Sequence, residues 1–266
     1  MTPLAPSRAP DAEQLLAAWD RAQLLDAALG APPDLAAAEA LQARVVAMRR
    51  ARGERTLGYK IGFTNRSIWP LYGVHHPIWA PVYDTTVTWL EGTDGQVALN
   101  RFVQPRLEPE IVFGLRASPA SADPRAVFDC IDWIAHGFEI VQSPFAGWKF
   151  DAAQAIAAQG LHGALLVGPR RPRSIVAGPQ ELAAGELVLS LDGREVARGS
   201  TEQVLGGPVQ ALGHLVSELL RRGETLAPDA IVTTGTITDA QPMRPGQQWR
   251  SILAGIELPG LCLRTA

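Results

Sequence analysis

The sequence has few cysteines and no long apolar run. Its 266 residues include two cysteines, Cys130 and Cys262, which are far apart and form neither a CxxC metal pair nor the framework of a secreted disulfide protein. No stretch reaches the roughly 18 consecutive apolar residues of a membrane span. The N-terminus also lacks the basic-then-apolar order of a signal peptide. We therefore expect a cytoplasmic protein that does not enter a membrane.

An excess of positive charge is missing as well. The formal net charge is -3 and the pI is near 6.0, which provides no electrostatic footprint for nucleic acid or an anionic lipid surface. The one basic cluster, PRRPR at Pro169–Arg173, lies in a proline-rich loop, and we interpret it as an exposed turn. Nucleic acid and membranes are thus excluded as expected partners.

Lysine is nearly absent. Of the 24 basic residues only Lys60 and Lys149 are lysines, in a chain rich in Ala, Gly, Pro and Arg. Where arginine serves as the general surface cation, a retained lysine suggests a need for a compact ammonium whose pKa burial can move. Apolar or aromatic neighbours in sequence would partly shield both lysines from water, which makes them candidate acids, bases or anchoring groups. The alternative is a surface lysine whose charged end reaches solvent.

Two helices are predicted before residue 56. Apolar residues recur at helical spacing over Asp11–Gly30 and Pro33–Gly53. From there on, short runs of Val, Ile, Leu and Thr alternate with Gly, Pro and Asp turns, which is typical of a mainly β body. We expect a helical N-terminal segment of residues 1–55 and a β-rich catalytic domain of residues 56–266.

Three further elements are predicted within this body. The dipeptide Asp192-Gly193 between alternating runs predicts a β-hairpin. Pro208–Gly223 has the proline start, apolar periodicity and glycine end of a helix. Val127–Ser143 is predicted as a helix that leads through Gly137 into a strand containing Glu139.

Three glutamates occupy unusually apolar surroundings. In FVQPRLEPEIVFGL, Phe102–Leu115, residues Glu108 and Glu110 share one face of a predicted strand because side chains alternate along a strand. The IVFGL that follows has no polar alternation, so both faces of this strand are expected to be covered. Glu139 lies between Phe138 and Ile140, where an unpaired carboxylate would cost several kcal/mol.

Carboxylates in such surroundings require a positive partner. Three of them, without a credible His or Cys cluster, favour a hard cation with oxygen ligands, Mg²⁺ or Mn²⁺. The alternatives are ion pairs with some of the arginines, or a solvent-facing stripe on a half-buried strand. The histidines are weaker candidates, because a lone histidine is more often a hydrogen-bonded structural residue.

Several motifs occur together in a characteristic order. They are GYKIGFT, PRLEPEIVFGL, FEIVQS followed by WKF, LGGPVQAL and IVTTGTITDAQPMRPGQQW, from about Leu57 nearly to the C-terminus. This ordered set resembles the fumarylacetoacetate hydrolase superfamily, specifically its branch of 2-keto-4-pentenoate hydratases and 4-oxalocrotonate decarboxylases. The resemblance implies an α+β fold, a mixed-strand β-roll with surrounding helices and an N-terminal helical segment. It also implies a homo-oligomer and a Mg²⁺ or Mn²⁺ site.

The resemblance assigns roles residue by residue. Glu108, Glu110 and Glu139 match the metal ligands. Lys60 matches the lysine of the GxKIGxT motif and Lys149 the lysine that follows the third ligand, both as catalytic groups. Gly235 and Thr236 match the part of the TGT turn that contacts the substrate.

Two segments depart from the pattern of the hydratases. They read GVDEPDYG where this chain has GVHHPIWA, so that Ile78 replaces an aspartate of the substrate pocket. The chain also has QAIAAQGLH in place of a DTIADNASS segment, which puts His162 at an altered position. His162 either takes over part of a proton relay or packs as a structural residue.

The function that the resemblance implies is that of a metal-dependent hydratase. Its substrate would be a small 2-oxo acid like 2-hydroxypenta-2,4-dienoate, in the breakdown of aromatic compounds. The alternatives are a 4-oxalocrotonate-type decarboxylase and a C–C bond hydrolase of acylpyruvate-like substrates, which normally uses a His–Glu acid-base pair. A catalytically silent binding or structural homologue, with its glutamates paired to arginines, is the non-enzymatic alternative.

Overall fold

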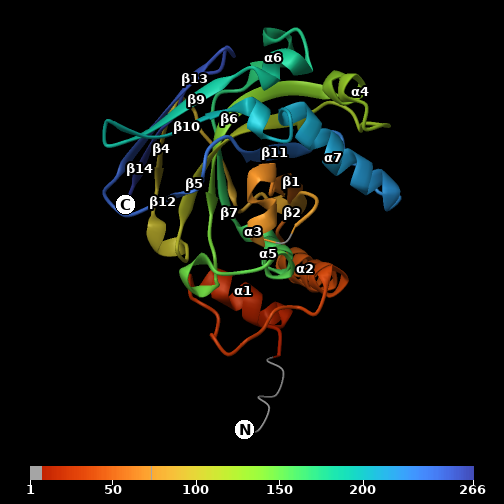
Figure 1. Cartoon of the computed structure of the whole chain (residues 1–266), viewed down its shortest axis with the longest axis vertical. Coiled ribbons are helices and arrows are strands. Elements are labelled where there is room, and N and C mark those ends of the chain that lie inside the picture. Colours follow the sequence, from red (N-terminus) through yellow and green to blue (C-terminus); the bar gives the residue numbers. More distant parts are fainter. Residues whose placement is uncertain (1–7, 73) are drawn as a thin grey trace.

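The computed structural model describes residues 8–72 and 74–266 as helices packed around two β-sheets (Figure 1). The described helices are α1 Ala12–Asp20, α2 Leu35–Ala51, α3 Trp69–Tyr72, α4 Pro124–Asp129, α5 Ala152–Ala157, α6 Pro179–Ala183 and α7 Pro208–Arg221. None of them is long and apolar enough to cross a membrane. The strands are β1 Thr56–Gly62, β2 Ile78–Tyr83, β3 Val87–Trp89, β4 Asp94–Val97, β5 Arg106–Leu115, β6 Ile131–Val141, β7 His162–Val167, β8 Arg171–Pro172, β9 Glu186–Leu191, β10 Arg194–Ser200, β11 Ile231–Thr236, β12 Gln241–Pro242, β13 Gln248–Ala254 and β14 Cys262–Thr265.

The predicted N-terminal helices form, but the first is shorter than expected. Helix α1 begins at a capping box in which Asp11 accepts from the backbone N–H of Gln14 and the Gln14 side chain accepts from that of Asp11. It ends at Asp20 rather than near Gly30, because Ala22 adopts a left-handed conformation with φ 50°. The chain then crosses to the body, where the Leu25 amide donates to the Pro144 carbonyl over 2.8 Å. The apolar spacing after Asp20 thus belongs to a loop that packs on the body, and not to a continuation of helix α1.

The larger sheet carries the functional region. In the described part of the chain it has nine strands, with the order β2-β1-β11-β5-β6-β7-β3, while β12 pairs with β5 and β8 with β6. Pairing is parallel between β1 and β11 and between β3 and β7, and antiparallel elsewhere. Strands β5 and β6 lie at the centre and pair along their whole lengths, from Arg106 opposite Val141 to Leu115 opposite Ile131. This curled mixed sheet confirms the predicted β-roll.

One prediction for this sheet was wrong. Residues 131–137 were expected to be helical, but α4 ends at Asp129 and β6 begins at Ile131. A short, mostly apolar segment such as Ile131–Gly137 fits a strand as well as a helix. The strand forms here because β5 pairs with β6 along its length on one side, while β8 pairs with Trp133 and Ile134 and β7 with Gly137 onward on the other.

The second sheet closes one side of the roll. In the described residues its order is β10-β9-β13-β14-β4. The predicted hairpin is confirmed: Asp192 and Gly193 both have positive φ, 48° and 80°, and join β9 to β10. Helix α7 also forms as predicted and packs its apolar face on the body.

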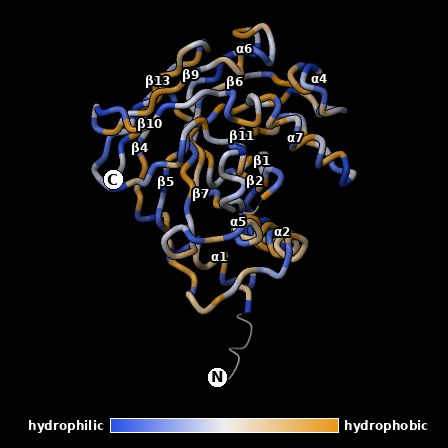
Figure 2. Tube along the Cα trace, viewed as in Figure 1, coloured by the Kyte–Doolittle hydropathy of each residue, from blue (hydrophilic) through white to orange (hydrophobic). Residues whose placement is uncertain are grey.

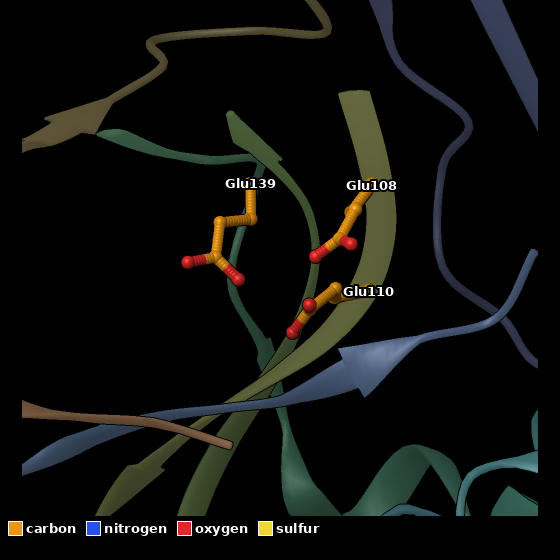
Figure 3. A group of neighbouring side chains, drawn as sticks. All are labelled: Glu108, Glu110 and Glu139. Carbon is orange, nitrogen blue, oxygen red and sulfur yellow. The ribbon is translucent and has the colours of Figure 1, made fainter. Parts of the chain in front are cut away.

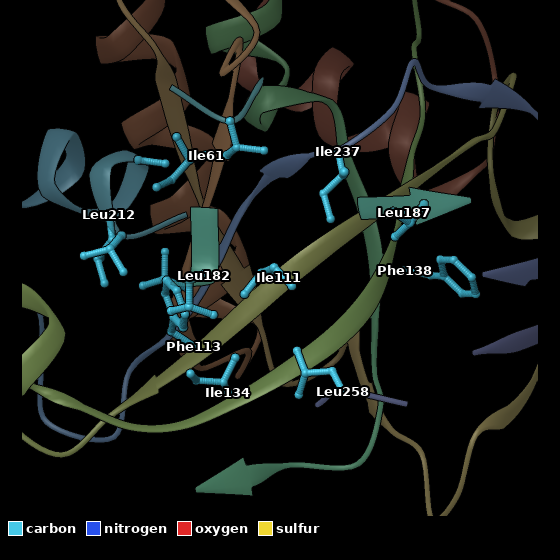
Figure 4. Packing of buried hydrophobic residues seen from close by; sticks show 14 of the residues in the cluster. Ile61, Ile111, Phe113, Ile134, Phe138, Leu182, Leu187, Leu212, Ile237 and Leu258 are labelled. Atoms are coloured by element: carbon cyan, nitrogen blue, oxygen red, sulfur yellow. The ribbon is translucent and has the colours of Figure 1, made fainter. Parts of the chain in front are cut away.

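Buried side chains form one main core between the sheets and α7, with Phe113, Phe138 and Leu212 among its members (Figure 4). A separate cluster joins α1 and α2 to α5 and includes Leu15 and Ile156. Hydrophobic segments accordingly gather inside the roll and at the contact of α2 with α5 (Figure 2). Strands begin at Thr56, next to the predicted boundary, and the division of the chain there into two folding units stays a prediction.

Candidate metal centre

The two central strands bring the three glutamates together. Glu108 and Glu110 lie on one face of β5, and Glu108 stands directly opposite Glu139 of β6 in the antiparallel register. One carboxylate oxygen from each residue lies within 4.8 Å of the others, so the three carboxylates gather around one point (Figure 3). Glu110 and Glu139 are fully buried. The expectation that both faces of this strand are covered is confirmed beyond Pro109.

Each buried carboxylate is held by one oxygen. Glu110 Oε2 accepts from the Gly235 amide over 2.8 Å and from the Thr233 hydroxyl, while its Oε1 has no hydrogen-bond partner among the described residues. Glu139 Oε1 lies 2.8 Å from Nδ1 of His162. Its Oε2 lies 3.2 Å from Lys60 Nζ but without hydrogen-bond geometry. A buried oxygen without a donor is costly, and a cation at the centre of the group would satisfy it.

The electrostatics favour such a cation. Removal from water raises the pKa of Glu108 to about 7, with Lys60 opposing and Glu139 adding to the rise. Burial, followed by the charges of Glu139 and Glu108, raises the pKa of Glu110 well above its ordinary value. For Glu139 burial acts in the same direction, but Lys60 and His162 outweigh it and lower the pKa. Three ionised carboxylates coexist here only when positive charge is placed between them.

The donor set fits a hard divalent ion. Carboxylate oxygens without nitrogen or sulfur ligands are what Mg²⁺ and Mn²⁺ prefer. The partners of Glu110 and Glu139 are a hydroxyl, an amide, an imidazole and an ammonium, rather than the arginines that the ion-pair alternative requires. The three glutamates are therefore the residues that would hold the metal.

A cavity of about 390 Å³ opens beside the glutamates. Lys60, Ile78, Glu108 and Thr236, all predicted site residues, line it. Lys60 is buried and donates to the Gly160 carbonyl over 3.0 Å. Burial alone would lower its pKa, but the charges of the three glutamates raise it. This lysine is a buried neighbour of the three glutamates rather than a surface residue.

Gly235 holds the Glu110 carboxylate instead of lining the cavity. Its amide holds Glu110, and its φ is +107°. A Cβ at this position would lie 2.1 Å from the Thr64 hydroxyl oxygen, so only glycine fits. Of the two residues predicted to contact the substrate, Thr236 therefore lines the cavity, whereas Gly235 lies behind it at Glu110.

His162 also lies behind the metal site. It is buried, with Nδ1 at Glu139 and Nε2 2.8 Å from the Thr86 hydroxyl oxygen. Burial lowers its pKa despite the neighbouring carboxylate. The structure thus places His162 where it orients the Glu139 carboxylate.

Lys149 lies apart from these residues. Its side chain is exposed, so the expectation that Trp148 and Phe150 shield it from water is wrong. Gly147 and Trp148 have left-handed φ values of 64° and 60°, and this turn directs Trp148 to the cavity and Lys149 to solvent. Its catalytic role stays a prediction without geometric support.

The prediction from sequence missed Arg106. It is two residues before Glu108 on the same face of β5 and lines the same cavity. The alternation that linked the two glutamates extends to it, and this was the available signal. His136, by contrast, is a buried structural histidine bonded to the Glu110 carbonyl and the Ser251 hydroxyl, as expected for a lone histidine.

Comparisons with known proteins agree with this geometry. Residues 72–258 match the family model described as fumarylacetoacetate (FAA) hydrolase C-terminal. A 4-oxalocrotonate decarboxylase of Pseudomonas sp. is 30% identical over 77% of this chain and 78% of its own length. A 2-hydroxyhexa-2,4-dienoate hydratase of Comamonas testosteroni is 26% identical over 79% of this chain and 78% of its length. Among solved structures, the 4-oxalocrotonate decarboxylase of Pseudomonas putida G7, complexed with magnesium and adipate, has a TM-score of 0.86 at 23% identity, covering 96% of this chain and 95% of that one.

Proposed function

The chain belongs to the fumarylacetoacetate hydrolase family, and within it we propose a metal-dependent lyase of unsaturated 2-oxo acids. The observation that carries this proposal is the group of three glutamates with unpartnered buried oxygens, placed beside a cavity that Lys60 also lines. Relatives named as decarboxylase and as hydratase support the same class, because both are lyases. The structure of a relative with bound magnesium supports Mg²⁺ as the cofactor, with Mn²⁺ as the alternative.

The residues have separable tasks in this proposal. A divalent ion held by Glu108, Glu110 and Glu139 supplies a Lewis acid toward the oxygens of a 2-oxo acid. The Lys60 ammonium at the cavity wall stabilises the negative charge that develops on the substrate. Ile78 and the other apolar lining residues provide an apolar wall for the carbon chain of the substrate.

Two lyase reactions are candidates. Hydration of an acid like 2-hydroxypenta-2,4-dienoate is the reaction predicted from sequence, in the catabolism of aromatic compounds. Decarboxylation of the 4-oxalocrotonate type is favoured by Ile78, which presents an apolar wall to the cavity where a hydratase has a carboxylic acid. Loss of CO₂ needs no activated water, so decarboxylation depends less than hydration on a carboxylic acid at position 78.

A third reaction, hydrolysis of a C–C bond, has weaker support. The described structure does contain a His–Glu pair, His162 with Glu139, but the histidine is buried behind the carboxylate. None of the described residues that line the cavity is a histidine. The acid-base pair that this reaction needs is therefore not directed at the substrate.

The test uses metal-stripped protein and two substrates. Ultraviolet absorbance of 2-hydroxypenta-2,4-dienoate and, separately, of 2-oxo-3-hexenedioate is followed with and without added Mg²⁺. Metal-dependent loss of the first identifies a hydratase, and loss of the second with release of CO₂ identifies a decarboxylase. A Glu110→Gln variant, inactive in both cases, controls for spontaneous turnover. No Mg²⁺ binding by the wild-type chain would refute the proposal in favour of a silent homologue.

The assembly and location of the protein stay predictions. A homo-oligomer is expected, and a monomeric mass in light scattering would contradict it. The cytoplasmic location is checked by cell fractionation.

A further inference from the structure

Three consecutive residues beside the cavity have left-handed backbone. Gln159, Gly160 and Leu161 have φ values of 56°, 59° and 62°. They belong to the QAIAAQGLH segment, which departs from the pattern of the hydratases. Glycine adopts this conformation readily, whereas a side chain disfavours it. Because two of the three residues carry a side chain, the turn persists only where surrounding contacts hold it, and such backbone is typical of functional sites.

The turn binds the Lys60 ammonium through its own backbone. The Gly160 carbonyl accepts from Lys60 Nζ over 3.0 Å, and Glu139 Oε2 lies 3.2 Å from the same nitrogen. A Cβ at Gly160 would lie 3.1 Å from Lys60 Cδ, so the missing side chain leaves room for the lysine. The position of the ammonium at the cavity therefore depends on where the turn places the Gly160 carbonyl.

The side chain of Gln159 fixes this turn from behind. It is buried and lies outside the cavity lining. Its Oε1 accepts from the Tyr83 hydroxyl over 3.0 Å, and its Nε2 donates to the Gln42 carbonyl over 3.2 Å. Burial raises the pKa of Tyr83 to about 12, so this hydroxyl remains a donor. Hydrogen bonds at both ends of the amide thus hold Gln159 in its left-handed conformation.

Gln42 connects the same point to the N-terminal helix α2. Its Nε2 donates to the carbonyls of Trp79 and Ile156 over 3.1 and 3.0 Å. Trp79 lies on β2 next to the cavity residue Ile78, and Ile156 belongs to α5. One residue of α2 therefore binds β2, α5 and Gln159 at once. Through it the N-terminal helical segment supports the wall of the cavity.

We propose that Gln159 is a positioning residue for Lys60. Its side chain, held by Tyr83 and by α2, fixes the left-handed turn, and the turn directs the Lys60 ammonium to the cavity. The inference rests on the proposed function, in which Lys60 acts on the substrate. Helix α2 then contributes to the reaction without contacting the substrate.

The scarcity of lysine provides a direct measurement. Because Lys60 and Lys149 are the two lysines of the chain, protein labelled with ¹³C at the lysine Cε has two such signals in an NMR spectrum. Lys149 is exposed and serves as the internal reference, and Lys149→Arg assigns the signals. In the Mg²⁺-loaded wild type we expect the Cε of Lys60 to have separate shifts for its two protons and a higher order parameter than that of Lys149.

Gln159→Leu removes both side-chain hydrogen bonds with little change in volume. The order parameter of the Lys60 Cε should fall toward that of Lys149. The kcat for whichever substrate the wild type consumes should fall about tenfold to a hundredfold, because the ammonium is displaced from the charge that develops in the transition state. KM and the affinity for Mg²⁺ should stay unchanged, since the bonds of Gln159 lead to Tyr83 and Gln42 and not to the glutamates.

A second variant tests the same contact more gently. Tyr83→Phe keeps the ring and removes the hydroxyl that donates to Gln159, so the same changes are expected to a smaller degree. Tyr59→Phe is the matched control, because Tyr59 directly precedes Lys60 on β1 but packs on the opposite face, against the main core. It should leave the Lys60 signal and kcat unchanged.

The outcomes distinguish this inference from the proposed function. An unchanged Lys60 signal or an unchanged kcat, in whichever of the two variants folds, would overturn the role of Gln159 and leave the metal-dependent lyase standing. A loss of Mg²⁺ affinity together with kcat would show that Gln159 supports the fold in general, and would overturn it as well. If the wild type consumes neither substrate, the proposed function fails, while the NMR comparison still decides whether Gln159 holds Lys60.

Discussion

The replacement Glu110→Gln tests two effects of the carboxylate cluster separately. One is the repulsion that destabilises the fold without metal, and the other is the stabilisation by bound Mg²⁺. Glutamine has the same shape, and its side-chain oxygen can still accept from the Gly235 amide and the Thr233 hydroxyl. Its NH₂ group then takes the position of Oε1, the oxygen without a hydrogen-bond partner. The substitution removes one charge and little else.

The expected effects follow from the geometry. Two unit charges no more than 4.8 Å apart repel each other by at least about 3.5 kcal/mol at an effective dielectric constant of about 20. Without metal the wild type relieves part of this repulsion by taking up protons, so the variant should be as stable as the wild type or more stable. With Mg²⁺ at about a hundred times its dissociation constant, binding stabilises the wild type by about 2.7 kcal/mol. For a chain of this size that raises Tm by about 5 to 10 °C, and the variant should lose the increase.

Differential scanning calorimetry in EDTA and in Mg²⁺ measures both quantities. Glu195→Gln is the matched control, because Glu195 is an exposed glutamate of β10 paired with Arg198. It should keep the full Mg²⁺ effect. The reasoning is refuted if Glu110→Gln retains the Mg²⁺-dependent rise in Tm, or if its Tm in EDTA falls by more than about 5 °C.

Three further substitutions test other parts of the structure. His162→Ala should weaken Mg²⁺ binding about 10-fold to 100-fold in calorimetry, because the ligand it orients is released; an unchanged affinity would show that His162 only packs. Glu54→Gln should cost about 3 kcal/mol in urea unfolding, because it breaks a buried pair with Arg49 at 2.8 Å. Burial alone would raise the pKa of Glu54, but its hydrogen bonds and arginine partners outweigh it and lower the pKa below its ordinary value of 4.5. The stability from Glu54 is therefore present above pH 4.5 and is lost as the pH falls through the lowered pKa, so the wild type and the variant should converge in acid. Gly235→Ala should abolish Mg²⁺ binding or folding, since its Cβ would collide with Thr64; a variant with normal binding would contradict the geometry.

Much of the metal centre was predictable because it depends on local alternation. In any strand the side chains of Glu108 and Glu110 share a face, and an apolar sequence around a carboxylate demands a compensating charge wherever the strand lies. The hairpin at Asp192-Gly193 and helix α7 were likewise set by residues close in sequence. The apolar neighbours of Glu139 likewise marked it as the third carboxylate, the ordered motifs that resemble the family matched the same three residues to metal ligands, and the fold brings the three together.

The neighbours of each strand were decided only by the tertiary structure. The register that sets Glu108 opposite Glu139, the bond from His162 and the cavity shared with Arg106 all join residues that are distant in sequence or far from any motif. The outward turn of Lys149 depends on left-handed backbone at Gly147 and Trp148, and the strand that begins at Ile131 depends on pairing with β5 on one side and β8 on the other. A sequence pattern determines which face of an element a side chain occupies, whereas the partner of that face is chosen by the packing of distant segments, whose energies no local pattern contains.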